Sequence, residues 1–150
     1  MKQRTAIPLT LDEQLCFALY STSLAMTKVY KPMLEKLGLT YPQYLAMLVL
    51  WEGHDLTVKD IAARLNLDPA TVTPLLKRLE TQGYVARVRG TEDERLVYVR
   101  LTQAGASLKR AARDIPAGIL CATGQKPEFL IRLRDDLTRL RATLNDAIEP

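Results

Sequence analysis

Apolar residues recur at three- and four-residue steps near the start of the chain and predict an amphipathic helix over residues 11–31. The apolar stripe consists of Leu11, Leu15, Leu19, Met26 and Val29. Thr10 is the candidate N-cap, because Glu13 follows it at the spacing of a capping box. Pro32 is expected to bend or end this helix, since proline cannot donate a backbone hydrogen bond.

A second apolar run indicates a buried helix over residues 44–51, which Gly53 stops. Residues 38–42 between the two helices predict a turn, because they include glycine and proline. A short helix follows over residues 57–65, and Thr57 is its expected N-cap. Residues 11–65 are therefore predicted to form three helices with non-helical connections.

The next helix has a distinct start at Asp68–Pro69, where a cap acceptor precedes proline at the first helical position. It should run to about Gln82, with Gly83 as its C-cap. Pro74 is expected to distort the helix over residues 70–74. The predicted buried face consists of Val72, Leu75, Leu76 and Leu79.

The apolar period changes from about four residues to two over residues 84–89 and 96–101, which predicts two paired strands. Residues 90–95 are mostly charged and form the expected tip of this hairpin. In the first strand, Arg87 and Arg89 are expected on the face opposite Tyr84, Ala86 and Val88.

After the hairpin, Thr102 is expected to cap a helix that runs to about Asp114. Pro116 and Gly118 weaken the helix prediction for the segment before Cys121, and Gly124 and Pro127 indicate another break in helical structure. A last helix carries a coiled-coil seam that either joins two subunits or packs within one chain. The seam consists of Leu130, Leu133, Leu137, Leu140 and Leu144.

Helix, tight turn, capped helix and basic hairpin, in this order, predict a winged helix-turn-helix that binds DNA. The fold class is mainly α with a small β-hairpin wing, and helices from both termini form a dimerisation region. We expect one subunit over residues 1–150, with a DNA-binding lobe over 40–101 and dimerisation helices over 10–38 and 102–150. The candidate DNA contacts are Thr71, Thr73, Lys77, Arg78, Gln82, Arg87, Arg89 and Arg95.

Composition sets limits on this interpretation. The net charge of +4 permits a polyanionic partner without requiring one, so a helical domain with a merely solvated hairpin is the alternative. No apolar run approaches eighteen residues and the first ten residues lack a signal-peptide core, so we expect a cytoplasmic protein with no membrane contact. One histidine and two cysteines far apart in sequence predict neither a metal site nor a cofactor.

Cys16 lies in an unusual apolar and aromatic setting, LCFALY, with Tyr20 one helical turn further on. Tyr30 is about 21 Å from Cys16 along one helix, so the two meet only if two copies of the helix cross antiparallel near Ser23. A tyrosine hydroxyl donated to sulfur favours the thiolate, whereas two acidic residues one turn earlier oppose it, and the sequence leaves this balance open.

These motifs resemble MarR-family winged-helix repressors, and within them the organic-hydroperoxide-sensing branch with two cysteines. The resemblance covers nearly the whole chain and includes LCFALY, MTKVYKPMLEKLGLTYPQYLAMLVLWE, TVTPLLKRLETQGYVARVRG, EDERLVYVRLT and IPAGIL. It implies a homodimeric repressor on palindromic operator DNA that controls an organic hydroperoxide reductase gene.

The resemblance also implies roles for single residues. Cys16 corresponds to the peroxidatic thiol, which an organic hydroperoxide oxidises, and Cys121 to a resolving thiol that pairs with Cys16 of the partner subunit. Arg95 corresponds to a wing arginine that enters the minor groove. The residues implied around the thiol are Tyr30 and Tyr41, with Tyr20 and Phe17 as weaker candidates. A cellular thiol reductant would reset the switch.

Two other functions remain open from the sequence. One is a repressor of the same fold that a small aromatic effector releases, with cysteines that play no part. The other is a thiol peroxidase, which would have no need of a basic wing. We therefore expect a regulator rather than an enzyme, and DNA binding with and without hydroperoxide separates the three.

Overall fold

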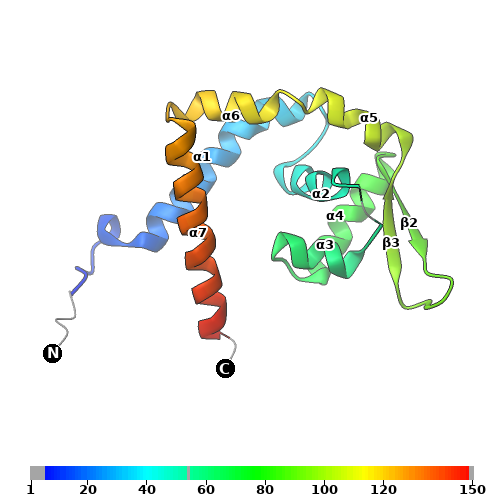
Figure 1. Cartoon of the computed structure of the whole chain (residues 1–150), viewed down its shortest axis with the longest axis horizontal. Helices are drawn as coiled ribbons and strands as arrows, with labels where there is room; N and C mark the ends of the chain where they lie inside the picture. The colour runs from blue at the N-terminus through cyan, green and yellow to red at the C-terminus, as the bar shows by residue number, and fades with distance from the viewer. Residues whose placement is uncertain (1–5, 54, 149–150) are drawn as a thin grey trace. The chain divides into compact units, whose positions relative to one another are not determined.

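The computed structural model describes residues 6–53 and 55–148, and the chain divides into two compact units, residues 1–113 and 114–150. The first unit contains a 3₁₀ turn Leu11–Glu13, α1 Leu15–Glu35, α2 Tyr41–Trp51, β1 Leu56–Thr57, α3 Val58–Leu65, α4 Pro69–Thr81, β2 Val85–Arg89, β3 Val97–Leu101 and α5 Gln103–Ala111 (Figure 1). The second contains α6 Ile115–Thr123 and α7 Pro127–Ile148. The mainly helical fold with a small sheet confirms the predicted fold class.

Helix α1 begins and ends later than predicted. The side chain of Thr10 makes no cap hydrogen bond, and α1 starts at Leu15 after Gln14, whose side-chain amide donates to two upstream carbonyls. Pro32 lies inside α1 and does not end it, because the helix continues to Glu35. A single proline removes one intrahelical hydrogen bond, and the tertiary contacts of the following turn offset this loss.

The predicted turn over residues 38–42 is partly wrong, because α2 already begins at Tyr41. Thr40 and Gln43 form a reciprocal capping box: the Thr40 N–H donates to Gln43 Oε1 at 2.9 Å, and the Gln43 N–H donates to Thr40 Oγ1. Pro42 occupies the second helical position, where a backbone N–H has no helical partner. The spacing T-x-x-Q is the sequence signal for this start.

Helices α3 and α4 form the predicted helix-turn-helix. Thr57 caps α3 and pairs reciprocally with Asp60, which confirms the predicted start. Asn66 adopts the left-handed conformation with φ of 56°, and the Leu67 N–H then donates to the Ala62 carbonyl at 3.0 Å. This closure satisfies the carbonyls at the end of α3 and sets the direction in which α4 leaves.

Helix α4 runs from Pro69 to Thr81 with Pro74 inside it, which confirms the predicted helix, and the distortion expected over residues 70–74 stays a prediction. The Asp68 side chain makes no cap hydrogen bond, although α4 does begin at Pro69. Gly83, with φ of +84°, lets the Tyr84 N–H close the end of the helix. Three of the four predicted core residues of α4 are buried and Leu75 is half-buried; the buried ones are Val72, Leu76 and Leu79.

The predicted hairpin is present, and it is part of a three-stranded antiparallel sheet in the order β1–β3–β2. Strands β2 and β3 pair from Val85 opposite Leu101 to Arg89 opposite Val97. Strand β1 was not predicted, because its two residues are too few to show an alternating pattern. Its Leu56 pairs with Val99 of β3. The largest fully buried side chains of this unit are Leu34, Met47, Ile61, Val72, Leu76, Leu79 and Val99.

Thr102 caps α5 as predicted, by accepting from the Gly105 N–H at 3.1 Å, but α5 ends at Ala111 rather than near Asp114. The prediction of a weakened segment before Cys121 is wrong, because α6 is a regular helix. Pro116 occupies one of its first two positions, where proline is tolerated. In the described residues, no helix is long and apolar enough to cross a membrane.

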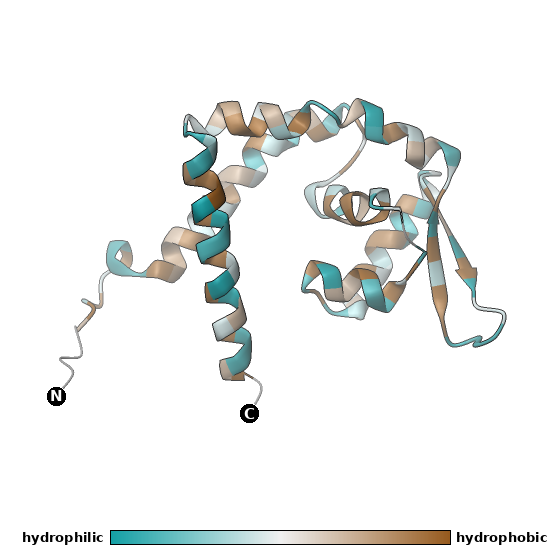
Figure 2. Ribbon diagram, in the orientation of Figure 1, coloured by the Kyte–Doolittle hydropathy of each residue, from teal (hydrophilic) through white to brown (hydrophobic). Residues whose placement is uncertain are grey.

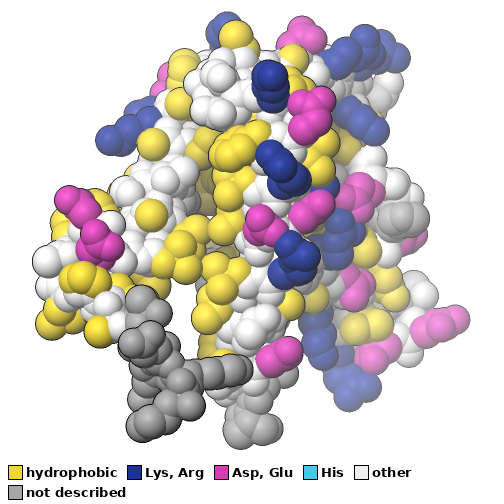
Figure 3. All heavy atoms as spheres, turned by 60° about the vertical axis from the view of Figure 1, so that its left-hand side comes forward, with side chains coloured by type: hydrophobic (Ala, Val, Ile, Leu, Met, Phe, Trp, Pro, Cys, Tyr) yellow, Lys and Arg dark blue, Asp and Glu magenta, His cyan; other side chains and the backbone are white. Residues whose placement is uncertain are grey.

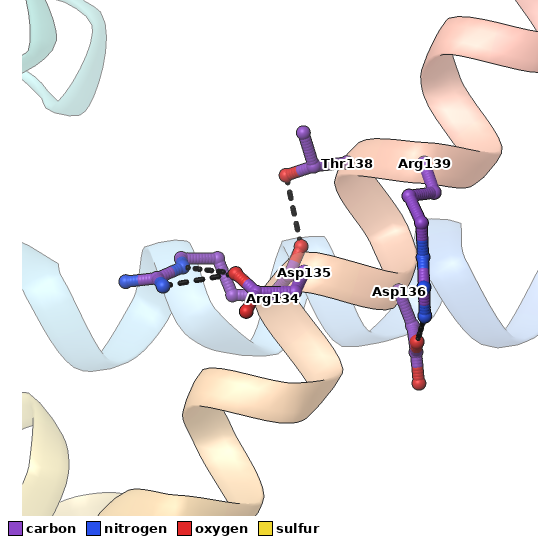
Figure 4. Close-up of polar contacts among 5 residues, drawn as sticks. All are labelled: Arg134, Asp135, Asp136, Thr138 and Arg139. Atoms are coloured by element: carbon purple, nitrogen blue, oxygen red, sulfur yellow. Dashed lines mark hydrogen bonds and ion pairs between the residues drawn. The ribbon is translucent and has the colours of Figure 1, made fainter.

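Helix α7 carries the predicted leucine seam as recurrent hydrophobic positions (Figure 2). None of its residues is buried, and Leu144 is 53 % exposed. The opposite side of α7 carries charges: Arg134 pairs with Asp135 at 2.9 Å and Arg139 pairs with Asp136 (Figure 4). The helix therefore presents an apolar and a charged side, as a helix at an interface does.

Candidate nucleic-acid interface and thiol site

The recognition helix α4 packs against α3 (Figure 1). It buries one apolar face, and short polar and basic side chains lie on its other face. Thr71, Lys77 and Arg78 are exposed, as predicted for groups that reach bases or phosphates. Thr73 is partly exposed, and its hydroxyl donates to the Pro69 carbonyl at 2.8 Å. These four side chains remain the candidate DNA contacts of α4.

Gln82 has a different setting from the other predicted DNA contacts. Its Nε2 donates to the Gly38 carbonyl at 2.6 Å, and its Oε1 accepts from Gln43 Nε2 at 3.0 Å. Both halves of the amide therefore bind within the protein. These two bonds fix the orientation of the exposed side chain, and one N–H and one lone pair of the amide are left over.

Arg87 alternates with Ala86 and Val88 as predicted, but it shares a face with buried Val85 rather than projecting freely. Its guanidinium pairs with Glu80 of α4 at 3.2 Å, and its backbone N–H donates to the same carboxylate at 3.1 Å. Hydrogen bonds from the Arg87 side chain and backbone hold the pKa of Glu80 below its usual range. Arg87 therefore ties the wing to the recognition helix in the free chain.

The tip of the wing carries the other two predicted arginines. Arg89 donates to the Glu94 carbonyl at 3.1 Å. Arg95 binds Asp93 through two N–H groups at 3.0 and 3.1 Å, and its side chain is still 91 % exposed. These hydrogen bonds lower the pKa of Asp93 and hold the planar guanidinium in one orientation at the tip. Sequence reasoning missed Asp93 as the partner that orients Arg95.

Both cysteines are free thiols and both are exposed. Cys16 lies in the first turn of α1, and Cys121 lies in α6, in the other unit. Near Cys16 in the sequence, Phe17 is 37 % and Tyr20 is 66 % exposed. Of the whole of α1, only Leu34 is buried, so the apolar stripe predicted from the sequence is largely open to solvent.

The two tyrosines predicted to contact sulfur lie together at the junction of α1 and α2. The ring centroids of Tyr30 and Tyr41 are 4.8 Å apart, and those of Tyr30 and Tyr44 are 5.7 Å apart. Burial, with the neighbouring phenols as a smaller cause, raises the pKa of Tyr30 to about 12. Burial also raises the pKa of Tyr41 and of Tyr44. All three therefore keep their hydroxyl protons, which makes them hydrogen-bond donors at neutral pH.

The high pKa of Tyr30 predicts a stability change in alkaline solution. As the pH rises from about 10 to about 12, the unfolded chain releases this proton while the folded chain retains it, so the free energy of unfolding falls. Tyr30→Phe should show a smaller fall over this interval in urea unfolding experiments. The difference in free energy of unfolding between the two proteins at neutral pH is the reference. If their free energies of unfolding fall in parallel above pH 10, the prediction is contradicted.

Known proteins resemble the chain over most of its length. The model of the family described as transcriptional regulator SarA/Rot matches residues 28–112. The organic hydroperoxide resistance transcriptional regulator of Bacillus subtilis (strain 168) is 53% identical over 135 residues, which cover 90% of this chain and 92% of that protein. The HTH-type transcriptional regulator TtmR of Methylorubrum extorquens (strain PA1) is 45% identical over 138 residues, covering 92% and 71%.

Solved structures give the same result. Reduced AbfR bound to DNA has a TM-score of 0.79 at 35% identity and covers 93% of this chain and 95% of that one; disulfide-formed AbfR has a TM-score of 0.62 at 34%, covering 93% of both. AbfR is a protein of Staphylococcus epidermidis. Fold and relatives define this chain as a winged-helix transcriptional regulator, not an enzyme. It belongs to the MarR/SarA family of DNA-binding regulators.

Proposed function

We propose that the protein is a homodimeric repressor that releases operator DNA when organic hydroperoxides oxidise Cys16. The observation that carries this proposal is the exposed thiol of Cys16 in the opening turn of α1. The 53% identity to an organic hydroperoxide resistance regulator supports the choice of oxidant. A relative that has been solved both bound to DNA and with a disulfide supports a thiol switch.

The chemistry needs two thiols and one peroxide. The Cys16 thiolate attacks one oxygen of ROOH, so that an S–O bond forms, the O–O bond breaks and the alcohol leaves with a proton. Cys16 is then a sulfenic acid. The thiol of Cys121 of the partner subunit attacks this sulfur, the S–S bond forms and water leaves. A cellular thiol reductant returns both sulfurs to the reduced state.

Both ends of the chain carry surfaces suited to dimerisation. Residues 10–38 and 102–150 are the proposed dimerisation segments, and residues 40–101 the DNA-binding lobe. Apolar side chains of α1 and of α7 are exposed in the single chain. The face drawn in Figure 3 shows hydrophobic side chains gathered beside charged ones. Contiguous exposed apolar surface of this kind marks an association site. Two subunits would place two recognition helices about 34 Å apart, one turn of DNA.

Within the DNA-binding lobe, α4 would enter the major groove and the wing tip the adjacent minor groove. The proposed contacts are Thr71, Thr73, Lys77, Arg78, Arg89 and Arg95. Arg87 would reach DNA only by exchanging its Glu80 partner for a phosphate.

The test is operator binding by gel shift with and without stoichiometric cumene hydroperoxide, together with a non-reducing gel. We expect tight binding when reduced, loss of binding after oxidation, and a covalent dimer that needs both cysteines. Release by an aromatic compound but not by hydroperoxide would support the effector-binding alternative. Catalytic peroxide consumption without DNA binding would support a thiol peroxidase.

Arg95→Ala should weaken operator binding by about tenfold, because it removes a preoriented cation from the wing tip. The slope of log affinity against log salt should become shallower by about one, and Cys16 oxidation should proceed as before. Arg100→Ala removes an exposed arginine with a carboxylate partner, Asp55, from the strand instead of the tip and is the matched control. Equal effects of both variants would exclude a specific wing contact.

Cys121→Ala should reach the sulfenic acid at the wild-type rate and yet be impaired in full release from DNA. The physical reason is that the first step needs only Cys16, whereas the disulfide also needs the second thiol. A sulfenic-acid trapping reagent and a gel shift on the same samples measure the two steps. Normal release in this variant would show that resolution is unnecessary.

A further inference from the structure

The core of the first unit contains a polar side chain that the functional site does not use. Among the described residues, Gln43 is the buried polar side chain, at 4 % exposure. Its Oε1 accepts from the Thr40 N–H at 2.9 Å and its Nε2 donates to Gln82 Oε1 at 3.0 Å. The Gln82 Nε2 continues the chain to the Gly38 carbonyl at 2.6 Å. We call Gln43 and Gln82 with these two backbone partners the amide bridge.

The amide bridge joins two parts of the protein with separate tasks. Gly38, with φ of +67°, and Thr40 form the corner between α1 and α2. Tyr41 is the first residue of α2 and stacks on Tyr30 of α1, so the tyrosine cluster belongs to the same corner. Gln82 is the residue that ends the recognition helix α4. The bridge thus connects the tyrosine-bearing corner to the C-terminal end of α4.

A second contact supports the same connection. The hydroxyl of Tyr84, which follows the end of α4, donates to the carbonyl of Leu37 at 3.2 Å. Leu37 precedes Gly38 in the corner, so two side chains from the end of α4 hold adjacent carbonyls of the corner. Two attachments side by side restrain rotation as well as translation of the corner relative to α4.

The energetics favour joint movement over separation. A buried amide that loses its partner costs about 1–3 kcal/mol, whereas a satisfied network specifies one arrangement. If the corner shifted while α4 stayed in place, the amide of Gln43, a residue that is only 4 % exposed, would lose its partner on Gln82. A shift of the corner that carries α4 along keeps every bond of the bridge.

We propose that the amide bridge makes the recognition helix follow the α1–α2 corner, and that Gln82 is a positioning residue for operator binding rather than a DNA contact. The trigger that moves the corner rests on the proposed redox function, since Tyr30 and Tyr41 are the side chains proposed to face the sulfur of the partner subunit.

The experiment uses Gln82→Met, which keeps the length of the side chain and removes both hydrogen-bonding groups. Thr81→Ala is the matched control, because the Thr81 hydroxyl donates only within α4, to the Lys77 carbonyl. Operator affinity is measured for the reduced and the hydroperoxide-oxidised forms of each protein, with the rate of Cys16 sulfenic acid formation. In Gln82→Met we expect an unchanged oxidation rate and a ratio of reduced to oxidised affinity at least about tenfold smaller than in wild type, which is about 1.4 kcal/mol of coupling. Thr81→Ala should keep the wild-type ratio.

The affinity ratio separates positioning from other roles. A purely structural role, or a direct base contact, would lower the reduced and oxidised affinities equally and keep the ratio, and either result overturns the proposal. If Gln82→Met is too unstable to assay, Gln82→Glu keeps an acceptor for Gln43 Nε2, removes only the donor to the Gly38 carbonyl and should show the same reduced ratio.

If the reduced and oxidised wild type bind operator DNA equally tightly, the proposed redox function is refuted, but the role of the amide bridge is not. Amide hydrogen exchange over residues 38–41, with and without operator DNA, then tests the bridge by itself. Operator binding should slow exchange in this corner in wild type and in Thr81→Ala, but not in Gln82→Met. Equal slowing in all three proteins would overturn the proposal.

Discussion

Cys16→Ser should bind operator DNA as tightly as the reduced wild type and stay bound at hydroperoxide concentrations that release the wild type. A serine hydroxyl has nearly the shape of the thiol, so the exposed start of α1 should be preserved. It cannot form a sulfenic acid, because only the thiolate attacks the peroxide bond. The expected result is loss of the whole oxidation-dependent change in affinity, which is tenfold or more and so about 1.4 kcal/mol at least.

The measurement is a gel shift over a series of cumene hydroperoxide concentrations, and Ser21→Ala is the control on the same helix. The Ser21 hydroxyl donates to the Phe17 carbonyl within α1 and has no role in the proposed thiol chemistry, so this variant should release DNA like wild type. Hydroperoxide-induced release of Cys16→Ser would show that another group senses the oxidant.

Gly105→Ala should lower the free energy of unfolding by about 3 kcal/mol, because there is no room for a methyl group at this position. A Cβ atom would lie 2.0 Å from the Tyr84 carbonyl oxygen and 3.2 Å from Leu101 Cδ2. The first of these atoms is backbone and cannot rotate away. The Gly105 carbonyl also accepts from Trp51 Nε1 at 2.9 Å, so α5 cannot retreat without breaking that bond.

The sign of this effect is diagnostic. In a solvated helix, replacing glycine by alanine stabilises by about 1 kcal/mol, so an α5 that did not pack on the strand would gain stability. Urea unfolding measures the change, and Ser107→Ala, at an exposed position of the same helix, should stay within about 0.5 kcal/mol of wild type. A stabilised Gly105→Ala would mean that the contact between α5 and Tyr84 is absent in solution.

Local signals in the sequence predicted the DNA-binding lobe well. The capping box of α3, proline at the start of α4, the glycine after α4 and the two-residue alternation of the hairpin all involve neighbours within a few residues. Such signals act through short-range hydrogen bonds and sterics, so they can be read without knowing the fold. The missed capping box of Thr40 and Gln43 was of the same kind and was visible in the sequence.

The prolines show where local reasoning failed. Pro32 was expected to bend or end α1, and the helix continues to Glu35; α4 was expected to continue through Pro74, and it does. Pro116 was expected to weaken a segment that is helical. A proline costs little near a helix start, and inside a helix its cost is set against burial of the surrounding side chains, which depends on distant segments.

The sequence by itself determined most of the helices and the two strands of the hairpin, which family the motifs resemble, and that two thiols are present. Only the tertiary structure decided which of the polar side chains predicted to contact DNA have partners within the protein. Gln82 binds Gln43 and Gly38, and Arg87 binds Glu80. The periodicity of the sequence does not predict these contacts. The physical reason is that a hydrogen-bond partner is chosen by proximity in space, whereas a helix or strand is specified largely by its own neighbours along the chain.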